Sequence, residues 1–301
     1  MTSLDRPTYL GPERARPEDS IYVRKNHLSL SAADKRRFVA AVLKLKAKGV
    51  YDQLVKDHRS AMPSMGATMQ MGKMAHRNPW FLPWHRQFLL RFEHELQKID
   101  DRVRLPYWDW LNDRSKSSSL WGEDFMGGSG KGVKQHVASG PFAYETGDWK
   151  LTVQSDRIRD PALRRAFGQD GRLPTKAQIR GALNRLPYDT APWDDMKRTR
   201  PGRGFRPTLE HIVHDPVHQW VGGTMELSTS PNDPVFFLHH ANVDRLWAVW
   251  ERKHGHEEPY LPASEGTRFD EDKPMPVLST MPRDVLSHHA LGYRYDVENT
   301  A

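Results

Sequence analysis

Cysteine is absent from all 301 residues of the sequence. Disulfide bonds, thiolate metal sites and cysteine nucleophiles are therefore excluded together. Any metal ion that the protein binds must be held by histidine, aspartate or glutamate side chains. The sequence contains 15 histidines, so a metal centre built from imidazole alone can be formed.

Long apolar runs are also missing. None approaches the roughly 20 residues that a membrane-spanning helix needs, and the polar, proline-rich segment 1–19 lacks the apolar core of a secretory signal peptide. We therefore expect no membrane partner. The protein is expected to be cytoplasmic, or to be secreted with a partner that carries the export signal.

Runs of basic residues are missing as well, although the formal net charge is +7. Lysine and arginine residues are scattered among acids along the chain, and no nucleic-acid-binding motif occurs. A solvated basic surface explains this charge, and we expect no nucleic-acid partner. Ten tryptophans, by contrast, are more than packing of such a chain requires, and they predict an aromatic-rich interior.

The length predicts a single domain over 25–301, preceded by an extended N-terminal arm over 1–24 in which three prolines prevent regular structure. A capping-box-like start at Ser31 and a stop at Gly49 predict a first helix, and a short second helix follows over 51–58.

Two stronger helices are predicted to open at Asn78-Pro79 and Asp233-Pro234, the second reaching about Lys253. In the first of these, His85 lies on the apolar face, and the opposite side is expected to carry Arg86, Arg91 and Glu95. Loops are predicted over 62–74 and 111–207, helical pieces near 160–168 and 175–186, and a mostly irregular tail after 254. The predicted fold is all-α: a helix bundle whose inner faces carry histidines, with long irregular loops.

Histidines gather in two clusters along the chain. The first is His58, His76 and His85; the second is His214, His218, His239 and His240. Three neutral imidazoles suit copper, zinc, iron or nickel and leave one side of the ion open. A zinc protease would need a glutamate that is absent beside His214, and a two-histidine, one-carboxylate iron site would leave several histidines unused.

Single histidines have simpler explanations. A lone inward histidine such as His58 is more often a hydrogen-bonded core residue, and the spacing of His214 and His218 is common by chance. The proline at 216 predicts that a helix begins at Asp215 or Pro216, with His214 just before it, because a residue that precedes proline avoids the αR region. Asp244, four residues after His240, is expected to orient one of the imidazoles.

Three sequence blocks go further than the histidines. They are Phe81-Leu-Pro-Trp-His-Arg-Gln-Phe88, Leu105-Pro-Tyr-Trp-Asp-Trp110 and Ser230-Pro-Asn-Asp-Pro-Val-Phe-Phe-Leu-His-His-Ala-Asn-Val-Asp244. In these blocks the sequence resembles bacterial tyrosinases of the Streptomyces type, within the type-3 copper group of tyrosinases, catechol oxidases and haemocyanins. The resemblance runs from about Tyr22 to Val297.

The resemblance implies two copper ions per chain, with O2 as co-substrate. It assigns His58, His76 and His85 to the first copper and His214, His218 and His240 to the second. His239 is implied to be a neighbour that does not bind metal, Phe236 a ring packed against the second site, and Glu210 the holder of a catalytic water. The implied function is oxidation of small phenols and o-diphenols to o-quinones; the alternative is haemocyanin-like O2 binding without turnover.

Asp215 departs from the family pattern, because members with strong monophenol activity often carry asparagine there. If Asp215 acts beside Glu210, the two carboxylates repel and one of them has a raised pKa. Oxidation of o-diphenols or o-aminophenols is then expected to exceed monophenol hydroxylation. The other interpretation is that Asp215 caps the following helix. Streptomyces-type relatives also imply a small partner protein that delivers copper and carries the export signal.

Overall fold

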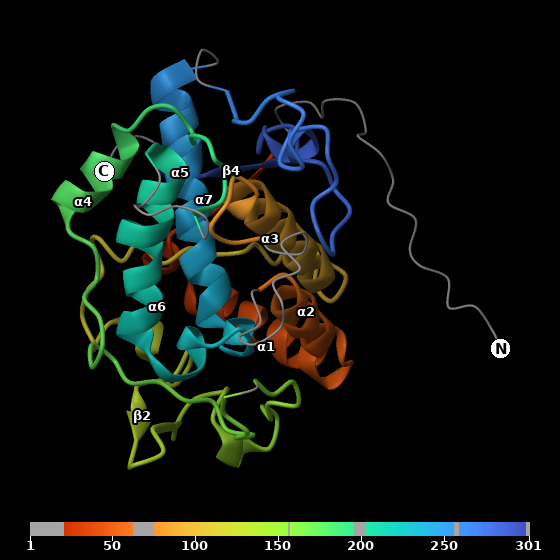
Figure 1. Ribbon diagram of the computed structural model, residues 1–301. Helices are drawn as coiled ribbons and strands as arrows, with labels where there is room; N and C mark the ends of the chain where they lie inside the picture. The colour runs from red at the N-terminus through yellow and green to blue at the C-terminus, as the bar shows by residue number, and fades with distance from the viewer. Residues whose placement is uncertain (1–20, 63–74, 156, 196–202, 256–258, 299–301) are drawn as a thin grey trace.

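A computed structural model describes residues 21–62, 75–155, 157–195, 203–255 and 259–298 (Figure 1). Helices dominate, as predicted. They are α1 (Ala32–Ala47), α2 (Val50–Ser60), α3 (Phe81–Gln97), α4 (Lys176–Leu183), α5 (Phe205–Thr208), a π-helix η7 (Leu209–His214), α6 (Asp215–Val221) and α7 (Val235–His254). Short 3-10 turns are η2 (His27–Ser29), η4 (Ser119–Trp121), η5 (Tyr144–Thr146), η8 (Gly223–Glu226), η9 (Ser230–Asn232) and η11 (Pro282–Val285). None of the helices in the described ranges is long and apolar enough to span a bilayer.

The first two helices begin and end where the sequence predicts. The Ser31 hydroxyl accepts a hydrogen bond from the Asp34 N–H and caps α1. Gly49 has a φ of 73° and makes the sharp turn into α2, a backbone conformation that glycine adopts without strain. This turn places α1 against α2, with Tyr51 and His58 on the buried side of α2.

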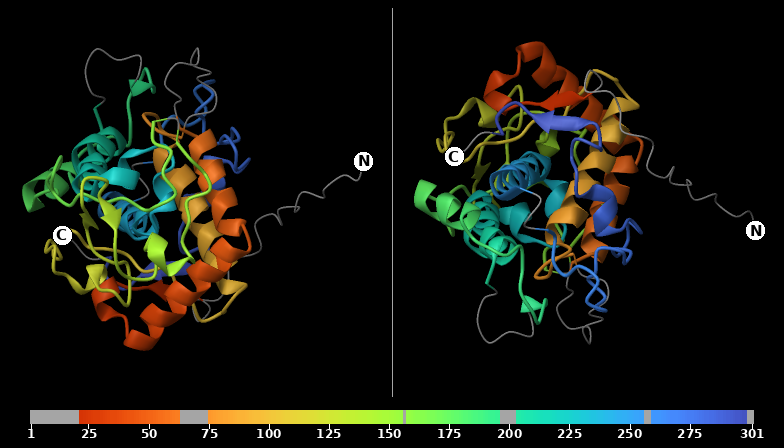
Figure 2. Two further views of the ribbon diagram at one scale, coloured as in Figure 1. Left: turned by 90° about the horizontal axis from the view of Figure 1, so that it is seen from below. Right: turned by 90° about the horizontal axis from the view of Figure 1, so that it is seen from above.

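Helix α7 lies at the centre of the molecule, with α3 packed along it (Figure 2). Every residue from Val235 to Trp250 is buried, which is the pattern of a helix surrounded by other elements on all sides. All ten tryptophans are at least nine-tenths buried, so the predicted aromatic interior is confirmed. A histidine in α7 must therefore lie inside the core.

One face of α3 differs from the prediction. Arg86 is fully buried, and its Nε atom donates to Asp244 of α7 over 2.6 Å. Its Nη1 atom also donates to the carbonyl oxygen of Leu286 over 2.6 Å. The periodicity of the sequence could not reveal this, because the partners of Arg86 come from distant segments. A buried guanidinium is tolerated where ion pairs and hydrogen bonds replace its hydration.

Helix α6 begins at Asp215, within the predicted range, but it continues directly from α5 and η7. His214 ends the π-helix and Asp215 has αR dihedral angles of −54° and −43°, so the expectation that His214 lies outside a helix was wrong. The Asp215 N–H bonds to the carbonyl oxygen of Glu210, five residues back. This wider turn accommodates Pro216, which lacks an N–H, without ending the helix.

Segment 160–168 is also not helical, although 175–186 does contain α4. The buried side chain of Arg165 makes two hydrogen bonds to Asp233, of 2.7 and 2.8 Å, and its Nη1 atom donates to the carbonyl oxygen of Gly127. The backbone of the same segment bonds to that of 135–137, beside the hairpin of β2 (Gly130–Lys131) and β3 (His136–Val137). Tertiary contacts therefore override the local helical propensity.

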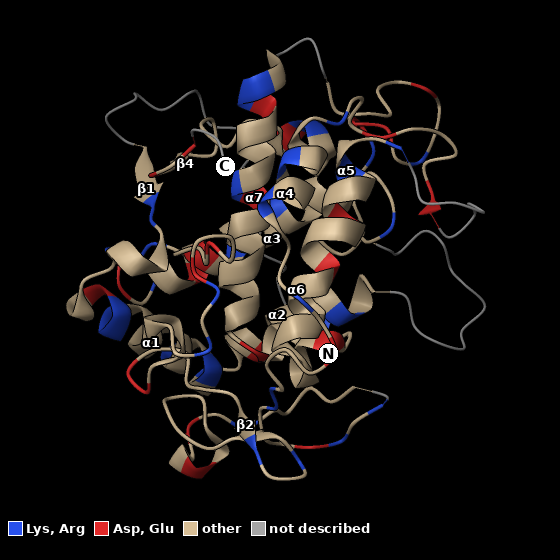
Figure 3. Cartoon of the chain, turned by 90° about the vertical axis from the view of Figure 1, so that its left-hand side faces the viewer, with Lys and Arg blue, Asp and Glu red and all other residues tan. Residues whose placement is uncertain are grey.

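The sequence analysis did not predict two further strands. β1 (Tyr22–Arg24) pairs in parallel with β4 (Tyr293–Tyr295), with Tyr22 opposite Tyr293. Arg24 is fully buried and bonds to Glu93 and Asp244, so residues 22–24 pack into the domain. The rest of the predicted arm, residues 1–20, and the predicted loop at 63–74 lie outside the described residues. Figure 3 shows basic and acidic residues interspersed along the ribbon.

Candidate metal centre

The first histidine cluster comes together as the sequence predicts. His58 lies on α2, His76 just before α3 and His85 on α3, and one ring nitrogen from each lies within 4.8 Å of the others. All three are at least nine-tenths buried. His58 is therefore not an isolated core histidine, because its ring converges with those of His76 and His85.

Backbone carbonyls orient two of these rings. His58 Nδ1 donates to the carbonyl oxygen of Ser228 over 3.0 Å, and His85 Nδ1 donates to that of Phe81 over 2.7 Å. Each Nδ1 therefore carries the hydrogen, and each Nε2 atom has a free lone pair. Both Nε2 atoms are buried and have no hydrogen-bond partner among the residues that the structure describes. Buried nitrogens of this kind normally find a partner, and a metal ion provides one.

The second cluster has the same construction. His214 and His218 lie on consecutive turns of η7 and α6 and face His240 of α7. The Nε2 atom of His240 is 3.3 Å from that of His214 and 3.2 Å from that of His218. His218 Nδ1 donates to the carbonyl oxygen of Met225 over 2.7 Å, which again leaves the Nε2 lone pair free. Three imidazole nitrogens thus converge on one point and fit a copper ion.

His239 lies in the same group but differs in its tautomer. The indole Nε1–H of Trp110 donates to His239 Nδ1 over 3.1 Å. An imidazole that accepts at Nδ1 carries its hydrogen at Nε2, so His239 offers no free lone pair toward the cluster. His240 is therefore the better ligand of the adjacent pair.

The two clusters lie face to face. The rings of His85 and His240 are stacked with centroids 4.3 Å apart, and Phe236 packs against both clusters, 4.1 Å from His240 and 4.9 Å from His58. Burial lowers the pKa of His58 to about 4 and that of His218 to about 3. Neutral imidazoles are the form that binds metal.

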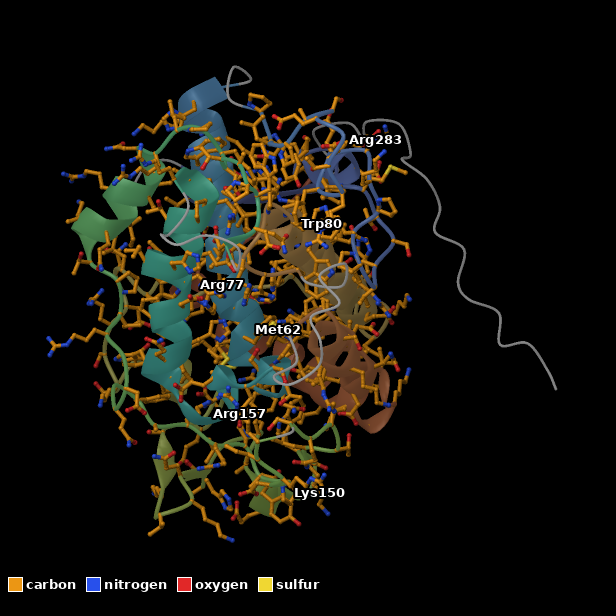
Figure 4. All side chains as sticks on the ribbon, viewed as in Figure 1. Met62, Arg77, Trp80, Lys150, Arg157 and Arg283 are labelled. Carbon is orange, nitrogen blue, oxygen red and sulfur yellow. The ribbon has the colours of Figure 1, made fainter. Side chains whose placement is uncertain are left out.

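A cavity of about 270 Å³ opens above the clusters. It is lined by His58, His76, His214 and His218 together with Arg77 and Asp215. Figure 4 labels Arg77 and Met62, two of the lining residues, which appear near the middle of this view, between α6 and α2. Because an apolar cavity of about 150 Å³ already holds benzene, this one has room for a single aromatic ring.

Two predicted catalytic carboxylates lie beside the second cluster but are engaged by arginines. Glu210 is fully buried and accepts hydrogen bonds from Arg206 Nη1 (2.7 Å) and the backbone N–H of Arg77 (2.8 Å). Asp215 lies 2.9 Å from Arg77 Nη2 and 2.9 Å from His214 Nδ1. Asp215 therefore orients a histidine and does not cap α6, which has no side-chain cap.

The pKa values of this carboxylate pair move apart, as expected. Burial raises the pKa of Glu210, and this outweighs the opposing effect of Arg206 and Arg77; repulsion by Asp215 is a smaller cause. Burial also acts to raise the pKa of Asp215, but the His214 hydrogen bond and Arg77 lower it overall. The larger reason for the raised value is thus burial and not mutual repulsion.

The expectation for Asp244 was wrong. Its carboxylate accepts from Arg86, Tyr293 and Tyr295 and contacts no histidine of the clusters. Carbonyl oxygens of Ser228, Phe81 and Met225 do the orienting instead. Sequence analysis missed them because a backbone carbonyl leaves no residue-type signal. Sequence analysis also missed the role of Arg77, which lines the cavity and contacts Asp215. Its position next to His76 was the only signal in the sequence.

Comparisons with known proteins agree with this geometry. Residues 48–253 match the family model described as the common central domain of tyrosinase. The chain is 45% identical to a tyrosinase of Streptomyces glaucescens, over 92% of this chain and 99% of that protein. It is 40% identical to grixazone synthase of Streptomyces griseus, over 92% and 99%. A solved polyphenol oxidase from Thermothelomyces thermophila shares the fold, with a TM-score of 0.64 at 20% identity, over 92% and 89% of the two chains. The chain belongs to the tyrosinase family.

Proposed function

We propose that this chain uses O2 to oxidise o-diphenols or o-aminophenols to quinone-type products faster than it hydroxylates monophenols. Its membership of the tyrosinase family makes it a dinuclear copper phenol oxidase. The observation that carries the proposal is the pair of buried histidine triads that face one another beneath a cavity of ring size. The proposed ligands are His58, His76 and His85 for one copper and His214, His218 and His240 for the other.

When bound, the copper pair supplies the redox chemistry with O2 that no side chain can provide. The protein supplies six imidazoles, the buried ring of Phe236 packed against His240, and a cavity that admits one ring. Hydrogen bonds from His58, His85 and His218 to carbonyl oxygens fix the tautomers of these three rings before metal binds.

Asp215 is the feature that favours diphenol over monophenol substrates. A phenol, with a pKa near 10, must give up its proton to react, and a strong base must accept it. Asp215 lines the cavity, but Arg77 and His214 lower its pKa, which makes it a weak base. An o-diphenol or o-aminophenol has a second ring substituent that helps it to bind and to donate electrons. The weak basicity of Asp215 should therefore slow the oxidation of these substrates less than it slows the hydroxylation of monophenols.

Oxygen uptake by the copper-loaded protein tests this, with tyrosine, DOPA, catechol and o-aminophenol compared side by side. We expect the two o-substituted classes to be oxidised clearly faster than tyrosine. Equal or higher rates with tyrosine would contradict the proposal.

Asp215→Asn isolates the role of that carboxylate. The variant should raise the monophenol rate relative to the diphenol rate, because an amide can donate a hydrogen bond where an ionised carboxylate only accepts. Glu226→Gln is the matched control, since Glu226 lines the same cavity without bonding to a histidine among the described residues. An unchanged rate ratio in Asp215→Asn with lowered thermal stability would assign Asp215 a structural role.

The haemocyanin-like alternative requires that substrates do not reach the copper pair. The cavity favours turnover, because its lining side chains Arg77 and Asp215 are 34% and 24% exposed. Incubation with catechol in air separates the two functions. Formation of coloured quinone indicates an oxidase, and reversible O2 binding without colour indicates a carrier.

We also propose that a small separate protein delivers copper and carries the export signal, so that the chain is secreted with this partner. The support is its similarity to Streptomyces tyrosinases. Expression with and without the neighbouring genes of its source, followed by copper analysis of the secreted fraction, tests the proposal. Full copper loading and secretion of the isolated gene product would rule the partner out.

A further inference from the structure

A third group of metal-binding side chains lies near the C-terminal end of the described chain. His288 and His289 follow η11, and Glu298 follows β4. One ligand atom from each of the three lies within 4.8 Å of the others. None of them lines the cavity above the two histidine triads. The established oxidation chemistry therefore gives these residues no task.

The spacing of the three side chains suits a metal ion. Glu298 Oε1 is 3.1 Å from His288 Nε2, and Glu298 Oε2 is 3.7 Å from His289 Nε2. Two ligand atoms at bond lengths of 2.0–2.2 Å from a tetrahedral ion lie roughly 3.3–3.6 Å apart. Small side-chain adjustments are enough to place one ion between them. His289 is 53% exposed, so an ion can enter from solvent and keep water as a further ligand.

His288 and Glu298 are the less exposed members of the group, with 12% and 13% of their side chains exposed. In the metal-free protein the His288 ring can donate from Nε2 to Glu298 Oε1 over 3.1 Å, and a metal ion would take the place of this hydrogen.

Neighbouring groups hold both of these side chains in place. The Tyr295 N–H donates to Glu298 Oε1 over 2.8 Å. On the other side of the His288 ring, its Nδ1 atom is 4.0 Å from Glu251 Oε2, which is itself held by Arg86 at 3.2 Å. At 4.0 Å this contact is too long for a hydrogen bond, but a small rotation of the His288 ring would let Nδ1–H donate to Glu251, as metal-binding histidines usually do to a carboxylate. The charge of Arg86 is offset by Asp244 and Glu251.

We propose that His288, His289 and Glu298 form a binding site for a divalent first-row transition metal ion, separate from the copper pair. Two imidazoles and one carboxylate suit Zn(II), Cu(II) and Ni(II), with Cu(II) expected to bind most tightly. Such an ion would tie the segment after β4 to the loop that precedes β4. A simple ion pair between His288 and Glu298 is the competing explanation, and it requires no metal.

Titration of the copper-loaded holoprotein with Zn2+ at pH 7.5 tests the site, with calorimetry and elemental analysis as readouts. The wild type should bind one zinc per chain while it retains its copper. His289→Ala should weaken this zinc binding by at least about tenfold, since it removes one of three ligands. This substitution is safe for folding because the side chain is mostly exposed. Glu298→Gln should have a similar effect.

His136→Ala is the matched control. His136 is also a partly exposed histidine paired with a carboxylate, with its Nε2 atom 2.7 Å from Asp160, but it has no second histidine beside it. Zinc binding should be unchanged in this variant. The proposal is overturned if the wild-type holoprotein binds no additional zinc. It is also overturned if His289→Ala binds zinc as tightly as the wild type and the His136→Ala control do.

Discussion

At the scale of the residue, a single hydrogen bond gives the adjacent histidines 239 and 240 of α7 different roles. Trp110 donates to His239 Nδ1, whereas the Nε2 atom of His240 lies within 3.3 Å of two other imidazole nitrogens. Neighbours in sequence therefore differ in chemistry because they differ in tautomer. The histidine types and their clustering were predictable from the sequence. The choice of His240 over His239 as the ligand came from the resemblance to bacterial tyrosinases. The hydrogen bond from the Trp110 indole to His239 now gives that choice a physical reason.

His240→Ala should lower the copper content from two ions to one per chain and abolish oxidase activity, because one of three ligands to the second copper is lost. Helix content should stay close to that of the wild type, since alanine is uncharged and favours the helix. Elemental analysis after treatment with a chelating resin, and circular dichroism, check this.

His239→Ala is the control for that substitution and should keep both coppers. Equal loss of copper from the two variants would mean that the wrong member of the pair was assigned. The assignment of two copper ions to the six histidines would be contradicted if the resin-treated wild type carried only one metal ion per chain. It would also be contradicted if zinc were the only metal that supported turnover with O2.

At the scale of the element, the helical stretch from α5 to α6 shows what sequence patterns miss. The helices α1, α2, α3 and α7 were predicted because capping residues and 3.6-residue periodicity mark them locally. The strands β1 and β4 and the irregular segment at 160–168 depend on partners distant in the chain, such as Tyr295 for Arg24 and Asp233 for Arg165, so local signals do not predict them. The same holds for buried Arg86, which periodicity assigned to a polar face. The π-helix η7 directly precedes Pro216, a residue whose local signal is a helix start.

Arg206 illustrates how such an element is stabilised. It is fully buried and bonds to Asp189, Asp195 and Glu210. Arg206→Met should destabilise the protein by about 3–5 kcal/mol, because three carboxylates lose the cation that compensates their burial. Urea unfolding of the holoprotein measures this change.

Arg102→Met provides the comparison for Arg206. Its side chain is 69% exposed and pairs with Asp100 at the surface. Its removal should leave the unfolding free energy nearly unchanged, because solvent screens an exposed ion pair. A loss at Arg206 no greater than the loss at Arg102 would show that the buried network contributes little to holding η7.

At the scale of the whole molecule, the cluster of buried histidines makes stability depend on pH and on metal. The pKa values of His58 and His218 lie near 4 and 3 in the folded protein, against an ordinary value of 6.5. The unfolded chain therefore binds more protons than the folded one between pH 6.5 and about 3. Stability is fully present above pH 6.5 and is lost as the pH falls through this window.

Thermal unfolding of the metal-free protein should show this dependence, with a melting temperature that drops steadily from pH 7 to pH 4.5. Glu251, whose pKa is raised to about 7, acts in the opposite direction, but it is a single group against several histidines. Copper should raise the melting temperature at every pH at which it stays bound, since it binds the folded state. A melting temperature that is constant over this range in the metal-free protein would contradict the prediction.

The pairing of β1 with β4 has a consequence for how the protein is made. Arg24 and Tyr295, which meet in this small sheet, are 271 residues apart in the chain. At roughly 5–20 residues per second, synthesis separates their appearance by roughly 15 to 50 seconds. Until Tyr295 has been synthesised, the charges of Arg24 and Glu93 cannot find their final environment beside Asp244 and the two tyrosines. We therefore expect the buried network around Asp244, which joins β1, α3, α7 and β4, to form only after the last strand has been synthesised.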